Sequence, residues 1–114
     1  MKISTIKELL EADVVCCEDG LSRHVYSACG SDMMSDVLAH VKNQAVLLTG
    51  LVNPQVIRTA EMMDMCCVVF VRGKMPSAEM IALAEESGIA VLATDIRMYE
   101  ACGILYARGL RNAE

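Results

Sequence analysis

The sequence predicts an α/β fold, in which a single domain forms three layers: a mostly parallel sheet with helices on both of its faces. Three observations support this prediction. A short apolar run, a turn and a helical pattern follow one another three times between residues 45 and 108. Each apolar run is continuous and aliphatic, as in strands that are covered on both faces. Glycine and proline recur at similar spacing in the first two copies, as Gly50 with Pro54 and as Gly73 with Pro76.

The chain has 114 residues, which fits one domain with its own core. We expect residues 1–44 to form a helix, a small β element and a second helix, and residues 45–110 to form three strand–helix units. Hydrophobic residues make up 54% of the sequence, and the mean hydropathy is +0.39. An apolar excess on a small domain favours burial between subunits, so we expect a homodimer.

Charge and hydropathy argue against nucleic-acid-binding, membrane and secreted proteins. The net charge is −5, and the Lys and Arg residues are scattered, whereas nucleic-acid binding needs a basic patch. No apolar run approaches the roughly 20 residues that span a bilayer, so we expect no membrane association. The N-terminus lacks the apolar core and cleavage site of a signal peptide. We therefore expect a cytoplasmic protein.

The first predicted element is a helix that runs through Leu10. Ser4 or Thr5 is the expected N-cap, and Thr5 with Glu8 offers a capping box. Its buried edge is predicted from the apolar spacing to contain Ile6, Leu9 and Leu10.

Two short strands are predicted next, over residues 14–17 and 24–30, with the turn pair Asp19-Gly20 between them. We expect them to form a small β element beside the repeated unit. Ser31-Asp32 is then expected to cap a helix that runs through His40 or Val41.

The repeated strands are predicted over residues 45–49, 67–71 and 89–93. Asn53 is the expected N-cap of the first repeated helix, with Pro54 at its first position. Pro76 is expected to play the part of Pro54 in the second copy, and Gly88 to follow the end of that helix.

In the third copy, Asp95 is the expected N-cap of a helix with two apolar stripes. Such a helix either forms a subunit interface or lies wedged between the sheet and its neighbours, and the pattern favours neither. One stripe consists of Ile96, Tyr99, Cys102 and Tyr106, and the other of Met98, Ala101 and Leu105.

Ligands of open parallel sheets bind beyond the carboxyl ends of the strands. Glycine there lets a backbone approach a ligand, threonine offers a hydroxyl, and a basic side chain meets a phosphate or carboxylate. Helix N-termini add N–H groups suited to an anion. The alternative is that these residues only form turns. The candidate ligand-binding residues are Thr49, Gly50, Asn53, Arg72, Gly73, Lys74, Thr94 and Asp95.

Other chemistries lack their residue patterns. Gly73-Lys74 is not a phosphate-binding loop, because no Gly stands five residues earlier and no Ser or Thr follows the lysine. The six cysteines include two adjacent pairs but no metal-ligand spacing, so we expect no metal, no cofactor and mostly buried free thiols. No nucleophile elbow or acid–base pair is present, so we expect no catalysis.

The repeated unit resembles the DRTGG domain family, and it is similar to the N-terminal domain of HPr kinase/phosphorylase. The resemblance rests on the opening residues 3–10, on residues 46–50 and 67–73, and on the run 82–94. Residues 51–53 depart from the family motif, which continues Thr-Gly with a second Gly and charged residues.

This resemblance implies a non-catalytic, often dimeric regulatory or interaction module, here standing alone. Its partners are expected to be a second copy of the chain, and either a partner enzyme or a small anion such as an adenine nucleotide. A small cysteine-based redox or metal-binding protein is the alternative.

Overall fold

Five strands form one sheet in the computed structural model, which describes residues 1–40 and 44–111. The strand order is β1-β5-β4-β3-β2. Strands β2 to β5 run parallel to their neighbours, and β1 runs antiparallel to β5 at one edge. The predicted parallel alignment of the three repeated runs is therefore confirmed. The strands are β1 (Asp13–Cys16), β2 (Ser27–Gly30), β3 (Ala45–Thr49), β4 (Cys67–Phe70) and β5 (Ala90–Ala93).

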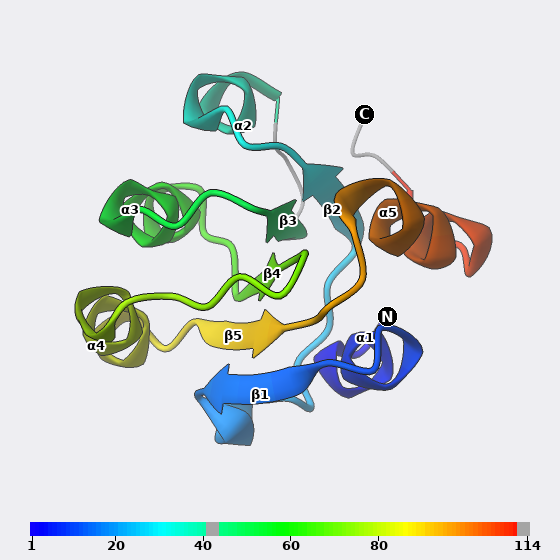
Figure 1. Ribbon diagram of the computed structural model, residues 1–114, viewed down its shortest axis with the longest axis horizontal. Coiled ribbons are helices and arrows are strands. Elements are labelled where there is room, and N and C mark those ends of the chain that lie inside the picture. Colours follow the sequence, from blue (N-terminus) through cyan, green and yellow to red (C-terminus); the bar gives the residue numbers. More distant parts are fainter. Residues whose placement is uncertain (41–43, 112–114) are drawn as a thin grey trace.

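Helices cover both faces of this sheet, which confirms the predicted three layers. Figure 1 shows α2, α3 and α4 on one side and α1 and α5 on the other. A short 3-10 turn, η1, follows β1. The helical elements are α1 (Ile3–Leu9), η1 (Glu18–Gly20), α2 (Met34–His40), α3 (Pro54–Met62), α4 (Ala78–Ser87) and α5 (Met98–Ala107). No helix in the described residues is long and apolar enough to cross a membrane.

The central strands are buried on both faces because each face packs against helices. Alternate side chains of one strand point to opposite faces, so β3 and β4 supply both cores. Leu47 and Phe70 pack with α3 and α4, whereas Leu48 and Val69 pack with α1 and α5. This double cover explains why the strands read as continuous apolar runs rather than as an alternation.

The N-terminal part differs from its prediction. The two strands do not form a β element beside the repeated unit but extend the same sheet at its opposite edges. The second strand is also shorter than predicted, because His24 makes only an isolated bridge with Lys2. Val41, the alternative end of the second helix, lies outside the described residues.

Several predicted helix starts are wrong. The first helix begins after Lys2, without a side-chain cap, so Ser4 and Thr5 lie inside it. Pro76 does not occupy the first position of α4, because Ser77 is the N-cap and the helix begins at Ala78. Asp95 does not cap α5, because residues 95 and 96 form a bend and Arg97, whose backbone is extended, is the N-cap.

Two other predicted boundaries are confirmed. The side chain of Asn53 caps α3 with Pro54 in its first turn. Gly88 follows α4 with φ of 71°, a left-handed conformation that suits a residue without a Cβ. The sequence thus identifies the Asn53 cap of α3 but not the equally local cap that Ser77 forms on α4.

Candidate functional site

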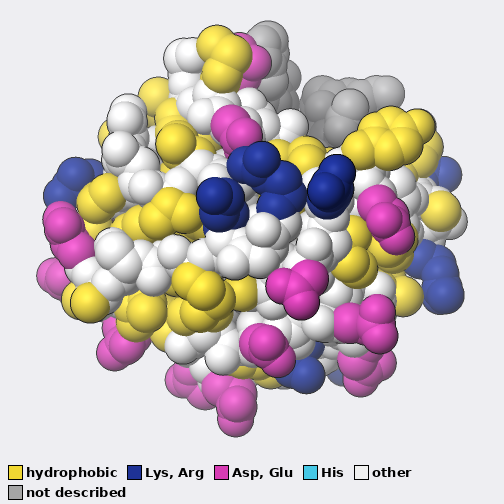
Figure 2. All heavy atoms as spheres, in the orientation of Figure 1, with side chains coloured by type: hydrophobic (Ala, Val, Ile, Leu, Met, Phe, Trp, Pro, Cys, Tyr) yellow, Lys and Arg dark blue, Asp and Glu magenta, His cyan; other side chains and the backbone are white. Residues whose placement is uncertain are grey.

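The candidate site lies at the carboxyl edge of the sheet, where the connections after β3, β4 and β5 leave the strands. The ends of these strands are in register, because Thr49 pairs with Phe70 and Phe70 pairs with Ala93. Basic side chains gather near the middle of Figure 2, over the region where Figure 1 places β3 and the connection after β4. The predicted edge therefore exists and has positive charge on it.

Thr49 ends β3 and is fully buried. Its hydroxyl donates to Oδ1 of Asp32 at 2.9 Å and accepts from the N–H of Leu51 at 3.1 Å. The N–H of Gly50 donates to the same Oδ1 at 2.7 Å. One carboxylate oxygen of the protein thus accepts from both donors that were expected to face an anionic ligand.

Thr94 forms the equivalent turn at the end of β5. Its Oγ1 accepts from the N–H of Ile96 at 3.2 Å, as the hydroxyl of Thr49 does from Leu51. The hydroxyl of Thr94 donates to the carbonyl of Leu10 at 2.7 Å, which ties β5 to the end of α1. Because Thr94 is only 4% exposed, its hydroxyl serves this internal contact.

Arg72 and Gly73 form a tight turn after β4. Both have positive φ, of 60° and 70°, and the N–H of Lys74 donates to the carbonyl of Val71 at 3.2 Å. These features match a type I′ turn. A left-handed conformation costs a residue with a Cβ about 1 kcal/mol, and such strain concentrates at functional sites. Among the candidate site residues other than glycine, Arg72 alone has this conformation.

The guanidinium group of Arg72 lies against the backbone of Gly50. A Cβ placed on residue 50 would come within 2.6 Å of Nη2 of Arg72. Glycine at this position lets the exposed Arg72 side chain lie over the end of β3. The structure thus brings together the guanidinium of Arg72 and the backbone of Gly50, which the sequence placed in separate loops.

A small hollow at the end of β5 has the opposite charge. Its volume is about 170 Å³, and the carboxylate-bearing residues Glu11, Asp13 and Asp95 line it together with Gly73 and Thr94. Gly73 is close to Asp95, since a Cβ on residue 73 would lie 3.2 Å from Oδ1 of Asp95. An anion is repelled here, so the Arg72 side of the edge is the better anion site.

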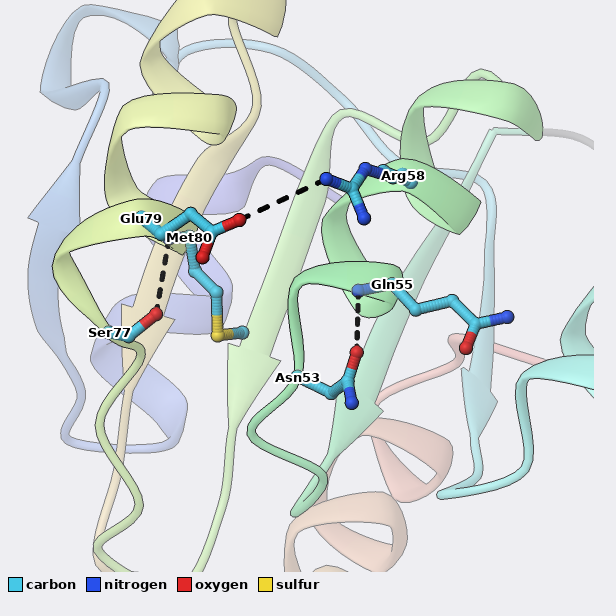
Figure 3. Close-up of polar contacts among 6 residues, drawn as sticks. All are labelled: Asn53, Gln55, Arg58, Ser77, Glu79 and Met80. Carbon is cyan, nitrogen blue, oxygen red and sulfur yellow. Dashed lines mark hydrogen bonds and ion pairs between the residues drawn. The ribbon is translucent and has the colours of Figure 1, made fainter.

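Two helices start beside this edge, as Figure 3 shows. Oδ1 of Asn53 accepts from the N–H of Gln55 at 2.8 Å, and Oγ of Ser77 accepts from the N–H of Met80 at 3.3 Å. Asn53 is therefore a helix cap rather than a residue aimed at a ligand. The N-termini of α3 and α4 add positive partial charge to the edge.

The eight predicted residues thus fall into groups. Gly50 lies beside Arg72, and Gly73 lies beside Thr94 and Asp95, whereas Asn53 serves its own helix. Lys74 is exposed in the turn that holds Arg72.

Sequence reasoning missed Asp32, which it assigned as a helix cap. The pairing of β2 with β3 brings the residues after Gly30 beside Thr49. The strand over residues 24–30 was predicted, but its position next to β3 was not, and that position is the signal that could have found Asp32.

Burial raises the pKa of five of the six thiols, which disfavours redox chemistry and metal binding by these five. Burial raises the pKa of Cys16 to about 12, with a further rise from the neighbouring Cys17. Burial also raises the pKa of Cys67, which is fully enclosed, and of Cys29, Cys66 and Cys102. A raised pKa leaves little reactive thiolate at neutral pH. Over residues 1–40 and 44–111, no three His, Cys, Asp or Glu side chains are grouped to hold a metal ion.

Comparison with known proteins identifies the fold. The DRTGG domain matches residues 5–107, and no curated protein sequence matches the chain. A similar solved structure contains the CBS and DRTGG domains of the regulatory region of Clostridium perfringens pyrophosphatase, complexed with its activator diadenosine tetraphosphate. The sequence identity is 18% and the TM-score is 0.74. The similarity covers 91% of the present chain but only 45% of the pyrophosphatase chain.

Proposed function

The chain belongs to the DRTGG domain family, and from this premise we propose that it is a non-catalytic regulatory module that binds a small anionic ligand, such as an adenine nucleotide. The pyrophosphatase region with the same fold is regulatory and binds an adenine dinucleotide as activator. In the present chain, binding would change how the module contacts a partner enzyme or a second copy of itself. The family assignment supports regulation rather than catalysis, because the pyrophosphatase region that shares this domain is a regulatory one.

The observation that carries this proposal is the position of Arg72. Its guanidinium lies against the backbone of Gly50, in the connection between β3 and α3. Arginine forms two parallel hydrogen bonds with a phosphate, and helix N-termini favour negative charge. Lys74 adds a second cation in the same turn, so a phosphate group of the ligand would bind here.

Asp32 restricts access of a ligand to two hydrogen-bond donors of this site. Its Oδ1 holds Thr49 and the N–H of Gly50, so a phosphate reaches these donors only by displacing the carboxylate. Asp32 is exposed and can rotate away from the edge. Ligand binding and the Asp32 contact would then compete, which gives the module two states.

Isothermal titration with ATP and with diadenosine tetraphosphate tests the proposal. We expect heat from the wild-type protein and at least about tenfold weaker binding by Arg72→Gly, since a charged hydrogen bond contributes about 1.5–3 kcal/mol. Arg58→Gly is the matched control, because Arg58 is 60% exposed on the neighbouring α3 and pairs only weakly with Glu79 at 3.9 Å. Absence of heat at millimolar nucleotide, or equal weakening by both variants, would contradict the proposal.

We also propose a homodimer that forms through the outer face of α5. One stripe of this helix faces the sheet, where Ala101 and Leu105 are buried. The other stripe leaves Tyr99 93% exposed and Tyr106 56% exposed. Exposed large aromatic side chains of this kind are typical of interfaces.

Sedimentation velocity tests the dimer. We expect the wild-type protein to sediment as a dimer and Tyr99→Asp as a monomer. Met62→Asp is the control, because Met62 is 71% exposed but lies on α3, on the opposite face of the sheet. A monomeric wild-type protein would exclude the dimer.

A further inference from the structure

A second hollow lies at the amino edge of the sheet, on the side away from Arg72. Its volume is about 370 Å³, within the usual range of small-molecule sites. The segments that lead into β4 and β5 line it, together with the segment before β2. Met65 and Ile89 form an apolar floor, because they are 3% and 2% exposed.

Arg23 is fixed at the wall of this hollow. Its Nη2 donates to the carbonyl of Gly88 at 2.7 Å and to that of Cys66 at 3.5 Å, and its Nε donates to Gly20 at 3.3 Å. These bonds join the end of α4, the start of β4 and the turn η1. A cation held by three separate segments is already ordered before a ligand arrives, which lowers the entropy cost of binding.

Two aromatic rings stand beside Arg23. His24 and Tyr26 flank the fully buried Val25, so both side chains project from the same side of the chain. Their planes differ by only 18°, and their centroids are 6.4 Å apart. Tyr26 remains 65% exposed. This pair offers a flat apolar face on which a planar ligand ring can stack.

Asp64 supplies the third chemical feature. It lines the hollow from the turn before β4, where its φ is 57°. A carboxylate accepts hydrogen bonds through two oxygens, so it prefers a ligand with neighbouring N–H donors. Arginine on another part of the wall prefers acceptors.

We propose that this hollow binds a guanine base, stacked on Tyr26. Guanine is planar and shows acceptors at O6 and N7, and an amine donor at N2 that suits Asp64. The acceptors suit Nη1 of Arg23, because Nε and Nη2 already donate to main-chain carbonyls. The site is separate from the phosphate-binding edge, so it neither needs nor excludes a ligand there. A nucleoside without phosphate is expected to bind it.

Titration of the ¹⁵N-labelled protein with guanosine tests this site, and inosine, which lacks the 2-amine, is the matched ligand. We expect guanosine to shift the amide signals of Cys66 and Gly88 and to bind about tenfold more tightly than inosine. Tyr26→Leu is expected to weaken guanosine binding about tenfold, whereas Tyr26→Phe retains it, because stacking needs only the ring. Arg72→Gly is expected to leave guanosine binding unchanged.

Asp64→Asn tests the base contact without disturbing the fold, since asparagine tolerates positive φ well. We expect this variant to bind guanosine and inosine equally. No shift with guanosine at its solubility limit would overturn the proposal. Guanosine binding that is weakened by Tyr26→Leu but unchanged by Asp64→Asn would also overturn the proposal. The guanine base would then occupy the neighbouring hollow that Tyr26 shares with Thr5 and Arg108.

Discussion

Two turns of this protein share one design but differ in their partners. At the end of β3 and at the end of β5, a buried threonine accepts from the N–H two residues later. Thr94 then donates to a main-chain carbonyl, that of Leu10, whereas Thr49 donates to the carboxylate of Asp32. The first contact is fixed by the fold, and the second depends on an exposed side chain that can move.

This difference shows how a repeated unit can keep one copy structural and leave another adaptable. The β5 turn holds α1 against the sheet and borders an acidic hollow. The β3 turn lies beside Arg72. Its hydrogen-bond donors, the Thr49 hydroxyl and the Gly50 N–H, are occupied by the Asp32 carboxylate and would become available to an anion if Asp32 moved. We therefore expect perturbations of the β5 turn to change stability, and those of the β3 turn to change binding.

Alkaline pH should have the largest effect, because it ionises a buried thiol in β1, the strand that pairs with β5. Burial raises the pKa of Cys16 from 9.0 to about 12. A group whose pKa is higher in the folded state than in the unfolded state adds to the free energy of unfolding, fully so below its unfolded-state pKa. For Cys16 this stabilisation is lost as the pH rises from about 9 to 12. The loss for Cys16 amounts to roughly 4 kcal/mol. Urea unfolding at pH 8, 9 and 10 measures its onset, and Cys16→Ala should show a shallower fall. A flat profile would contradict this account.

Thr94→Val should have the next largest effect, a loss of roughly 2 kcal/mol in the free energy of unfolding. Valine matches the shape of threonine but leaves the Leu10 carbonyl and the Ile96 N–H without their buried partner. Thr94→Ser retains the hydroxyl and should lose less. Thermal unfolding of the three proteins measures the difference, and equal stability of the valine variant would show that the tie to α1 contributes nothing.

The same substitution at Thr49 should cost less, about 1 kcal/mol, because Asp32 is exposed and water can replace the lost bond. Thr49→Val is also expected to change nucleotide binding, since it frees the carboxylate from one of its two donors. Chemical unfolding and calorimetry on one preparation separate the two effects. If Thr49→Val destabilises the protein more than Thr94→Val, the contrast between the turns is wrong.

Arg72→Gly should have the smallest effect on stability and the opposite sign, a gain of about 0.5 kcal/mol. Glycine relieves the left-handed strain at residue 72 but adds chain entropy to the unfolded state. Arg72→Ala removes the same side chain without relieving the strain and should not gain stability. A loss of stability in the glycine variant would show that Arg72 is structural rather than held for binding.

The sequence predicts strands β3, β4 and β5 well because the signals that mark them are local. Continuous apolar runs mark strands that helices cover on both faces, and the Asn53-Pro54 pair marks a helix start. Asp95 is also a residue type that caps helices, but the hydroxyl of Thr94 accepts from the N–H of Ile96 in a bend at residues 95 and 96, and α5 begins only after Arg97.

The candidate site was less predictable because it depends on contacts between distant segments. Asp32 reaches Thr49 only because β2 pairs with β3, and Arg72 reaches Gly50 only because β4 lies beside β3. The sequence placed Thr49, Gly50 and Arg72 at one edge, but it gave no sign that a carboxylate of the protein already accepts from the first two.

The most direct test of this account is an NMR titration of the ¹⁵N-labelled protein with diadenosine tetraphosphate. We expect the largest amide shifts at Gly50, Gly73 and Lys74, with smaller changes at Asp32 as its carboxylate is displaced. Shifts confined to the amino edge around Gly88, or no shift at millimolar ligand, would contradict an anion site over the end of β3.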